Sequence, residues 1–262
     1  MEIITLLKIG GKILDDEPTL DQLLDDFCAL SGPKVLIHGG GKAATEMAAR
    51  LGLEAMMVEG RRVTDAAMLE VVVMVYAGLV NKQVVAKIQA RGQTSVGLTG
   101  ADFGLMLAHK RPVVRVDYGW VGDVDQVDGP RVQWLLDHGV LPVVAPITHD
   151  GRGQLLNTNA DTMAAAIANA LAPLAPVRLV YSFEKPGVLR DPTDDHSVIS
   201  LITPSLFLQY REAGVIAGGM VPKLEAACSA LEAGVEEVVI CQAKALRQVG
   251  TPGFVGTVIR KD

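Results

Sequence analysis

The chain has few aromatic residues and no basic cluster. Aromatic side chains make up 4% of its 262 residues, while apolar residues as a whole make up 49%. The core must therefore be built from Val, Leu, Ile, Ala and Met, which is typical of a buried parallel sheet covered by helices. The net charge is −6. Without a basic cluster, this charge argues against nucleic acid as the main partner.

The chain also lacks a disulfide framework, a secretory signal and a long hydrophobic run. Its three cysteines, Cys28, Cys228 and Cys241, are far apart and form no CxxC pattern. They are expected to be reduced core thiols in a cytoplasmic protein. No signal peptide is recognised, because Met1-Glu2 leads directly into a strand. The most apolar segment, residues 68–80, is too short to cross a bilayer. It is expected to be a core helix or a helix that packs on a second subunit.

Two strands are each followed by glycines. The apolar run at residues 35–38 predicts a buried strand, and Gly39-Gly40-Gly41 separates it from a predicted helix over residues 42–51. A second predicted strand, residues 3–9, runs into Gly10-Gly11. Backbone N–H groups can approach an anion closely at such turns, and a helix N-terminus adds partial positive charge. The pair of turns therefore predicts one anion site lined from both sides.

Strand and helix patterns alternate through the rest of the chain. We expect further strands over residues 94–98, 141–145, 177–181, 235–241 and 257–260, and helices over residues 20–30, 66–91, 131–138, 162–170, 203–213 and 224–233. This alternation predicts an α/β fold with a mostly parallel sheet and helices on both faces. Pro173 and Pro176 mark a boundary, so we expect lobes over residues 1–172 and 173–262.

The glycine turns do not form a Walker A loop. Ala43 and Ile13 stand where that motif requires Ser or Thr. The spacing Gly39-x-Gly41-x-x-Ala44 does fit a dinucleotide fingerprint, and Glu59 lies near the distance expected for its acidic residue. That motif is short and permissive, and it explains none of the other polar motifs. A dinucleotide-binding oxidoreductase is therefore a distant alternative.

Motifs spread over nearly the whole chain resemble those of the amino-acid kinase family. In order, they are Lys8-Ile9-Gly10-Gly11, His38-Gly39-Gly40-Gly41, Gly60-Arg61-Arg62-Val63-Thr64, Leu156-Asn157-Thr158-Asn159-Ala160-Asp161 and Gly218-Gly219-Met220-x-x-Lys223. Each is weak alone, but their order and spacing are specific. The resemblance implies an open three-layer αβα sandwich with a mostly parallel central sheet. It also implies an N-terminal lobe for the amino acid and the dimer contact, and a C-terminal lobe for ATP.

Within the family, the chain is similar to members that phosphorylate the side-chain carboxylate of N-acetyl-L-glutamate in arginine biosynthesis. This resemblance implies that Lys8 and Lys223 are the transition-state cations and that Asp161 holds both by charge-assisted hydrogen bonds. It further implies that Arg62 grips the substrate α-carboxylate and that Asn157 hydrogen-bonds the amino-acid end. The N–H groups of Gly40 and Gly41 would face the substrate.

The same resemblance implies ATP as the phosphoryl donor. The residues expected to contact it are Gly10, Gly11, Val215, Ile216 and Ala217. Mg²⁺ would be held mainly by the ATP phosphates and water, and no His, Cys and carboxylate cluster suggests a tight metal site. Residues 182–188 read Ser-Phe-Glu-Lys-Pro-Gly-Val, where related kinases usually have an Asp-containing turn. Nucleotide contacts in that loop are therefore not carried over.

Several related activities stay open. The acyl group on glutamate could be N-succinyl instead of N-acetyl, and kinases of carrier-bound aminoadipate look very similar. An aspartokinase is disfavoured, because those enzymes carry extra regulatory domains. A binding module without catalysis is disfavoured as well, because it would have lost a lysine, and both Lys8 and Lys223 are present.

The sequence predicts a homodimer whose activity is insensitive to arginine. Arginine-inhibited members of the family carry an extra N-terminal helix that interlaces dimers into a hexamer, and here the first strand begins by Ile3. The apolar residues 68–80 could bury a shared face about a two-fold axis. Light scattering and an arginine titration test the two halves separately. A hexamer that arginine inhibits would contradict the prediction.

Overall fold

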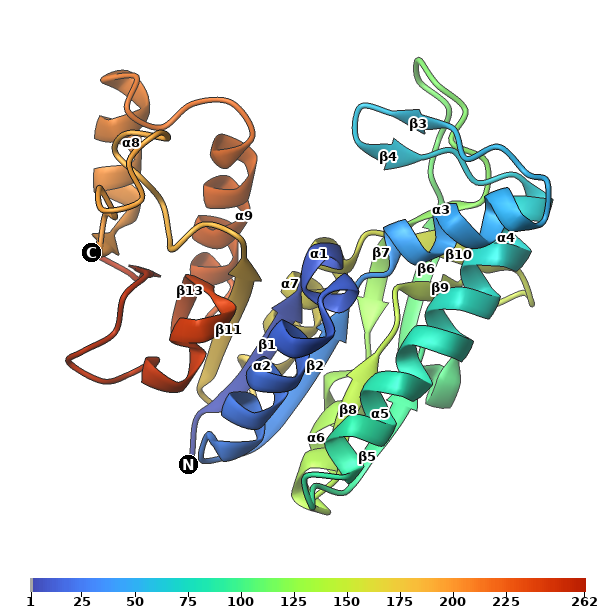
Figure 1. The fold of residues 1–262 in the computed structure, drawn as a ribbon, viewed down its shortest axis with the longest axis horizontal. Coiled ribbons are helices and arrows are strands. Elements are labelled where there is room, and N and C mark those ends of the chain that lie inside the picture. Colours follow the sequence, from blue (N-terminus) through green and yellow to red (C-terminus); the bar gives the residue numbers. More distant parts are fainter. Residues whose placement is uncertain (1) are drawn as a thin grey trace.

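A sheet of eight strands forms the centre of the structure, a computed structural model that describes residues 2–262 (Figure 1). Its strands are β1 (Ile4–Ile9), β2 (Lys34–His38), β5 (Ser95–Leu98), β8 (Leu141–Val144), β11 (Val177–Phe183), β12 (Leu201–Ile202), β13 (Glu237–Gln242) and β14 (Thr257–Ile259). Their order across the sheet is β12-β14-β13-β11-β1-β2-β8-β5. Within the described residues, neighbouring strands pair in parallel except β13 with β14. The expected mostly parallel sheet is confirmed.

Strands β1 and β11 join the two halves of the chain. β11 pairs with β1 on one side and with β13 on the other. In Figure 1, the elements that follow β11 lie on the left, and most of the preceding elements lie on the right. Residues before and after Pro173 and Pro176 therefore contribute to one continuous sheet.

Helices cover both faces of this sheet. The α-helices of the described residues are α1 (Gly11–Asp15), α2 (Glu17–Ala29), α3 (Gly41–Arg50), α4 (Ala66–Val72), α5 (Asn81–Gln89), α6 (Gly129–Asp137), α7 (Ala160–Leu171), α8 (Pro204–Glu212) and α9 (Met220–Glu232), of which α3 and α4 pack together in a separate cluster. One buried cluster joins the sheet to α6, α7, α8 and α9. A second joins its other face to α2, α5 and the 3₁₀ segment η3 (Ala243–Gln248). The expected three-layer αβα sandwich is confirmed.

The alternation of side chains along β1 decides where Lys8 lies. Ile4 and Leu6 belong to the cluster that contains α7, whereas Leu7 and Ile9 belong to the cluster on the other face. Successive residues of a strand point to opposite faces. Lys8 therefore shares the face of Ile4 and Leu6 and lies on the same side as α7.

Smaller β elements cover the carboxyl ends of the strands in the N-terminal half. A hairpin consists of β3 (Met57–Val58) and β4 (Arg61–Arg62). A closed barrel consists of β6 (Met106–Lys110), β7 (Val121–Val127), β9 (Ile147–His149) and β10 (Leu155–Thr158), with the 3₁₀ segment η2 (Asp102–Gly104) preceding β6. β4 and β10 carry two of the expected substrate residues, Arg62 and Asn157.

The long helix predicted over residues 66–91 is present and continuous. It comprises α4, the π-helical segment η1 (Val73–Val80) and α5. Asp65 caps its start, because the Oδ1 atom accepts a hydrogen bond from the Met68 amide at 2.8 Å. Among residues 2–262, this 24-residue helix is the one with the length and composition of a membrane span, and 44% of its most apolar window is buried. A core helix meets the same criteria, so this is weak support for a membrane span.

Candidate active site

An ion pair between Lys8 and Asp161 links the central strand to the start of α7. The Lys8 Nζ atom lies 2.6 Å from the Asp161 Oδ1 atom. Lys8 occupies the carboxyl end of β1 and is 8% exposed. The side chain of Asn159 caps α7 by accepting hydrogen bonds from the amides of Asp161 at 2.8 Å and Thr162 at 3.0 Å. The cap fixes the first turn of α7 and therefore the place of the carboxylate.

The two glycine turns lie side by side. β1 and β2 are parallel neighbours with Ile9 opposite His38, so both turns occur at the same edge of the sheet. A Cβ atom on Gly39 would lie 3.8 Å from the Gly11 amide nitrogen. Gly40 has a φ of 150°, and a Cβ there would lie 2.8 Å from the Tyr76 ring. Only glycine fits at Gly40, and its backbone is free to face a ligand.

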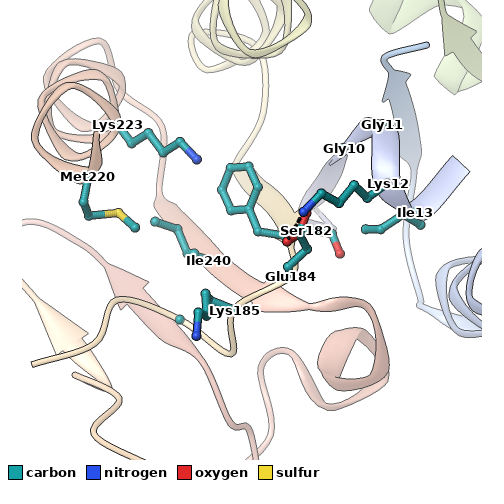
Figure 2. A pocket seen from close by; sticks show the side chains of 12 residues that line it. Gly10, Gly11, Lys12, Ile13, Ser182, Glu184, Lys185, Met220, Lys223 and Ile240 are labelled. Atoms are coloured by element: carbon teal, nitrogen blue, oxygen red, sulfur yellow. Dashed lines mark hydrogen bonds and ion pairs between the residues drawn. The ribbon is translucent and has the colours of Figure 1, made fainter. Parts of the chain in front are cut away.

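A cavity of about 300 Å³ opens beside the first turn (Figure 2). Lys223 reaches toward it from α9, and Gly10, Gly11 and Lys12 line the opposite side. Lys12 also pairs with Glu184, at 2.7 Å between Nζ and Oε2. Lysine ammonium groups and glycine amides are the groups that hold polyphosphates in proteins. The cavity therefore has the chemistry of a nucleotide phosphate site.

The structure shows one of the two contacts expected of Asp161. Asp161 was expected to hold both lysines, but among residues 2–262 its carboxylate pairs with Lys8 and makes no ion pair with Lys223. The Lys223 Nζ atom instead lies 3.7 Å from the centroid of the Phe183 ring. Burial lowers the pKa of Lys223, while the nearby Asp161 carboxylate opposes this shift and Lys8 adds to it. The cause of the difference is geometric, because the flexible lysine stem lets its ammonium settle on the ring face.

A second cavity of about 230 Å³ opens beside the other glycine turn. It is lined by Gly39, Gly40, Gly41, Arg61, Arg62, Tyr76, Arg111, Asn157 and neighbouring residues. The buried Arg62 donates hydrogen bonds from Nη2 to the Gly41 carbonyl and to the Thr45 hydroxyl, both at 2.7 Å. Its buried Nε atom has no hydrogen-bond partner among the described residues. Arg62 therefore lines this cavity with a guanidinium that is tied to the second turn.

The second cavity is rich in positive charge. Three arginines line it, namely Arg61, Arg62 and Arg111. The Asp123 carboxylate balances Arg111 and accepts hydrogen bonds from its Nε atom at 3.1 Å. Asn157 donates from Nδ2 to the Thr64 hydroxyl at 3.0 Å, so its side chain is oriented by the loop before α4. Carboxylates are the natural ligands of such an arginine-lined cavity.

Some expected nucleotide residues lie elsewhere. Val215 and Ile216 precede α9, where both amides donate to the Tyr210 carbonyl and Ile216 is buried. They and Ala217 are absent from the lining of the cavity beside Gly10 and Gly11, so their nucleotide contacts stay a prediction. Within residues 2–262, no group of three or more His, Cys, Asp or Glu side chains is placed to hold a metal ion.

The side chain of His38 supports the second glycine turn by a hydrogen bond. Its Nδ1 atom lies 2.7 Å from the Gly39 carbonyl oxygen, which requires that Nδ1 carry the proton, and Nε2 accepts from Asn81 Nδ2 at 3.1 Å. The ring is fully buried. Burial lowers the pKa of His38 to about 4, and the hydrogen bond to Gly39 opposes the shift only in part. His38 is therefore neutral at pH 7 and acts as a structural support of the turn.

Residues 4–242 match the amino acid kinase family. The chain belongs to this family. The resemblance seen in the sequence motifs is thus confirmed, and the sheet described above is the family fold.

Relatives of this family cover the chain almost completely. An acetylglutamate kinase of Phocaeicola vulgatus is 55% identical and covers 99% of both chains. An acetylglutamate kinase of Bacteroides thetaiotaomicron is 58% identical, covering 94% of this chain and 96% of its own. Among solved structures, an N-acetylglutamate synthase from Neisseria gonorrhoeae, in complex with coenzyme A and N-acetyl-glutamate, has a TM-score of 0.82 at 25% identity. That match covers 99% of this chain and 60% of the synthase chain.

Sequence reasoning missed three side chains that border the site. Phe183 was noted only as part of a divergent loop, although its place two residues after Tyr181 on a strand predicts that both rings share a face. Tyr76 was hidden in a long apolar run. Arg111 lay in a segment without a motif, so no signal in the sequence singled it out.

The state of His38 predicts a pH dependence of stability. The unfolded state binds a proton near the ordinary pKa of 6.5, while the folded state resists it down to about 4. As the pH falls between these values, His38 should therefore remove on the order of 3 kcal/mol from the free energy of unfolding. Urea titrations from pH 7 to pH 4.5 should show a shallower decline for His38→Asn than for the wild type. Parallel declines would contradict a neutral buried His38.

Proposed function

We propose that this protein transfers the γ-phosphoryl group of ATP to the side-chain carboxylate of N-acetyl-L-glutamate. The product is N-acetylglutamyl 5-phosphate, an acyl phosphate of arginine biosynthesis. The single observation that carries the proposal is the presence of two cavities at neighbouring glycine turns, one lined by lysines and one by arginines. The acetylglutamate kinase names of relatives at 55% and 58% identity support the same reaction.

The chemistry needs positioning and charge neutralisation. A glutamate side-chain carboxylate has a reference pKa of about 4.3, so the nucleophile is already ionised at neutral pH and no base is needed. One of its oxygens forms a bond to the γ-phosphorus while the bond from that phosphorus to the β,γ-bridging oxygen breaks, and ADP leaves with the electron pair. The loose transition state carries charge on the equatorial, attacking and leaving oxygens. Lys8 and Lys223 are the proposed cations, and Asp161 orients Lys8.

The second cavity is the proposed place of the acylated amino acid. The reacting carboxylate of the substrate would lie toward Gly40 and Gly41, and the substrate α-carboxylate would be held by the guanidinium of Arg62. Asn157 is the proposed partner of the amino-acid end. The 2.7 Å hydrogen bond from the Arg62 side chain to the Gly41 carbonyl supports these roles, because one arginine could then contact both the turn and the ligand.

The first cavity is the proposed place of the ATP phosphates, near Gly10, Gly11 and Lys12. Val215, Ile216 and Ala217 are the proposed contacts for the rest of the nucleotide. Because the described residues offer no carboxylate cluster for a metal, Mg²⁺ would be held by the phosphates and water, which suits an ion that keeps several waters. Mg²⁺ supplies charge neutralisation on the phosphates.

A second candidate substrate is N-succinyl-L-glutamate, which the arginine count of the second cavity favours. N-acetylglutamate brings one carboxylate besides the reacting group, and Arg62 suffices for it. An N-succinyl group brings one more, and Arg61 lines the same cavity, whereas Arg111 is already paired with Asp123. Carrier-bound aminoadipate is disfavoured relative to both, because no observation points to a carrier.

The proposed assembly is a cytoplasmic homodimer. The long helix exposes apolar side chains, with Met74 at 54% and Leu79 at 47%, and a partner could cover them. Cys28, Cys228 and Cys241 are free thiols, which fits a reducing compartment. Residues 1–172 are the proposed acylglutamate lobe with the dimer contact, and residues 173–262 the proposed ATP lobe.

An ATP-consumption assay tests the proposed reaction directly. The purified protein is supplied with Mg-ATP and with N-acetylglutamate, N-succinylglutamate, free glutamate or aspartate in parallel. We expect turnover with an acylated glutamate and little with the free amino acids, because only acylation removes the positive α-amino charge next to Arg62. Preferred use of aspartate, or no turnover with any of the four, would refute the proposal.

Arg62→Lys should raise the Michaelis constant for the acylglutamate about tenfold or more and leave that for ATP within a few-fold. Lysine keeps the charge but lacks the planar fork, and hydrogen bonds to charged groups contribute about 1.5–3 kcal/mol each. Steady-state kinetics with each substrate varied in turn measures the split. Arg50→Lys, an exposed arginine at the end of α3, is the matched control. A change in the ATP constant alone would mean that Arg62 serves the other cavity.

A further inference from the structure

Lys223 lies against an aromatic ring where an acidic partner was expected. Its Nζ atom is 3.7 Å from the centroid of Phe183, which is close enough for a strong cation–π contact. The Nζ atom of Lys8 lies 5.4 Å from the same centroid, still within the range of that interaction. One ring therefore contacts both of the proposed transition-state cations.

The ring is held in place by its neighbours on β11. Phe183 and Tyr181 are two residues apart on the strand, and their rings stack with centroids 5.9 Å apart and an interplanar angle of 4°. Tyr181 is buried, and its hydroxyl lies 3.4 Å from the backbone carbonyl oxygen of Asp161, to which it donates. The stack thus connects the end of β11 with the first turn of α7, where Asp161 pairs with Lys8.

Other groups near Lys223 are committed elsewhere. Glu184 is paired with Lys12, and Asp161 is paired with Lys8. Lys185, the next charged residue in the loop, pairs with Asp195 at 2.8 Å. Among residues 2–262, Lys223 makes no ion pair, so the Phe183 ring is the contact that fixes its ammonium group.

We propose that Phe183 is a positioning residue that holds the ammonium group of Lys223 beside Lys8 before ATP arrives. The inference rests on the proposed kinase function. Lys8 is already paired with Asp161, whereas the aromatic ring attracts the Lys223 ammonium without neutralising it, so Lys223 stays available for the phosphates. A carboxylate in the same place would form a salt bridge that the phosphates must break. Phe183 thus keeps the donor in place and available.

The first experiment observes the contact without substrate. Protein labelled with ¹³C at the lysine ε-carbons is examined by NMR, and the Lys223 signal is assigned by its absence in Lys223→Met. The ring current should move the ε-methylene protons of Lys223 upfield in the wild type. This displacement should be lost in Phe183→Leu and kept in Phe183→Tyr. An unchanged Lys223 signal in Phe183→Leu would overturn the proposal, whether or not the protein is a kinase.

The second experiment measures the catalytic consequence. Phe183→Leu should lower kcat about two- to thirty-fold, the range of a cation–π contact from exposed to desolvated sites, with little change in the acylglutamate Michaelis constant. Phe183→Tyr should restore most of the turnover. In a Lys223→Ala background, Phe183→Leu should have almost no further effect, because the Lys223 ammonium is gone and Lys8 is held by its ion pair with Asp161. Additive losses in the double variant would overturn the proposal.

Controls separate this inference from folding and from the kinase assignment. Phe254→Leu removes a half-buried aromatic ring from the other face of the sheet and should change neither the Lys223 signal nor kcat. Thermal unfolding establishes that each variant is folded. A wild type without kinase activity would refute the proposed function and leave the NMR result to decide the contact. An active wild type with full activity in folded Phe183→Leu would refute the role of Phe183 alone.

Discussion

The ion pair of Lys8 with Asp161 is the constraint on which the rest of the site depends. A lysine that is 8% exposed at the end of a central strand needs a partner, because an unpaired buried charge costs several kcal/mol. The partner can come only from the face that Lys8 shares with Ile4 and Leu6, which α7 covers. The cap from Asn159 begins α7 at the edge where β1 ends. Strand alternation and a helix cap together thus place one paired cation at the sheet edge from which both glycine turns begin.

The sequence predicted the scaffold better than the contacts. The apolar runs before Gly10-Gly11 and before Gly39-Gly40-Gly41 predict two strands, and the glycines predict where these strands end. Both signals are local in the sequence. Contacts between distant elements are not local. The direction taken by the long stem of Lys223 depends on Phe183, about forty residues earlier, so a motif could name the lysine but not its neighbour. The π-helical form of residues Val73–Val80 was not predicted for a different reason. An apolar run does not distinguish the hydrogen-bond pattern of a π-helix from that of an α-helix.

Positive side chains gather at the cavities of a protein whose net charge is negative. The chain carries a net charge of −6, yet lysines and arginines gather at the two cavities. Anionic substrates are drawn to such a local field, and walls of low dielectric strengthen it. His38 adds no charge to this field, because burial keeps it neutral. The neutral His38 ring supports the second turn by a hydrogen bond, so the positive potential at the cavities comes from the lysines and arginines.

The measurement that tests this account most directly is steady-state kinetics of Asp161→Asn with both substrates varied. Asparagine keeps the shape but removes the charge that fixes Lys8, so kcat should fall by about 10²-fold or more while both Michaelis constants stay within a few-fold. Asp128→Asn, which removes an acidic charge at the start of α6 outside the lining of both cavities, is the matched control. A folded Asp161→Asn enzyme with near-normal kcat would contradict the claim that this ion pair organises the site.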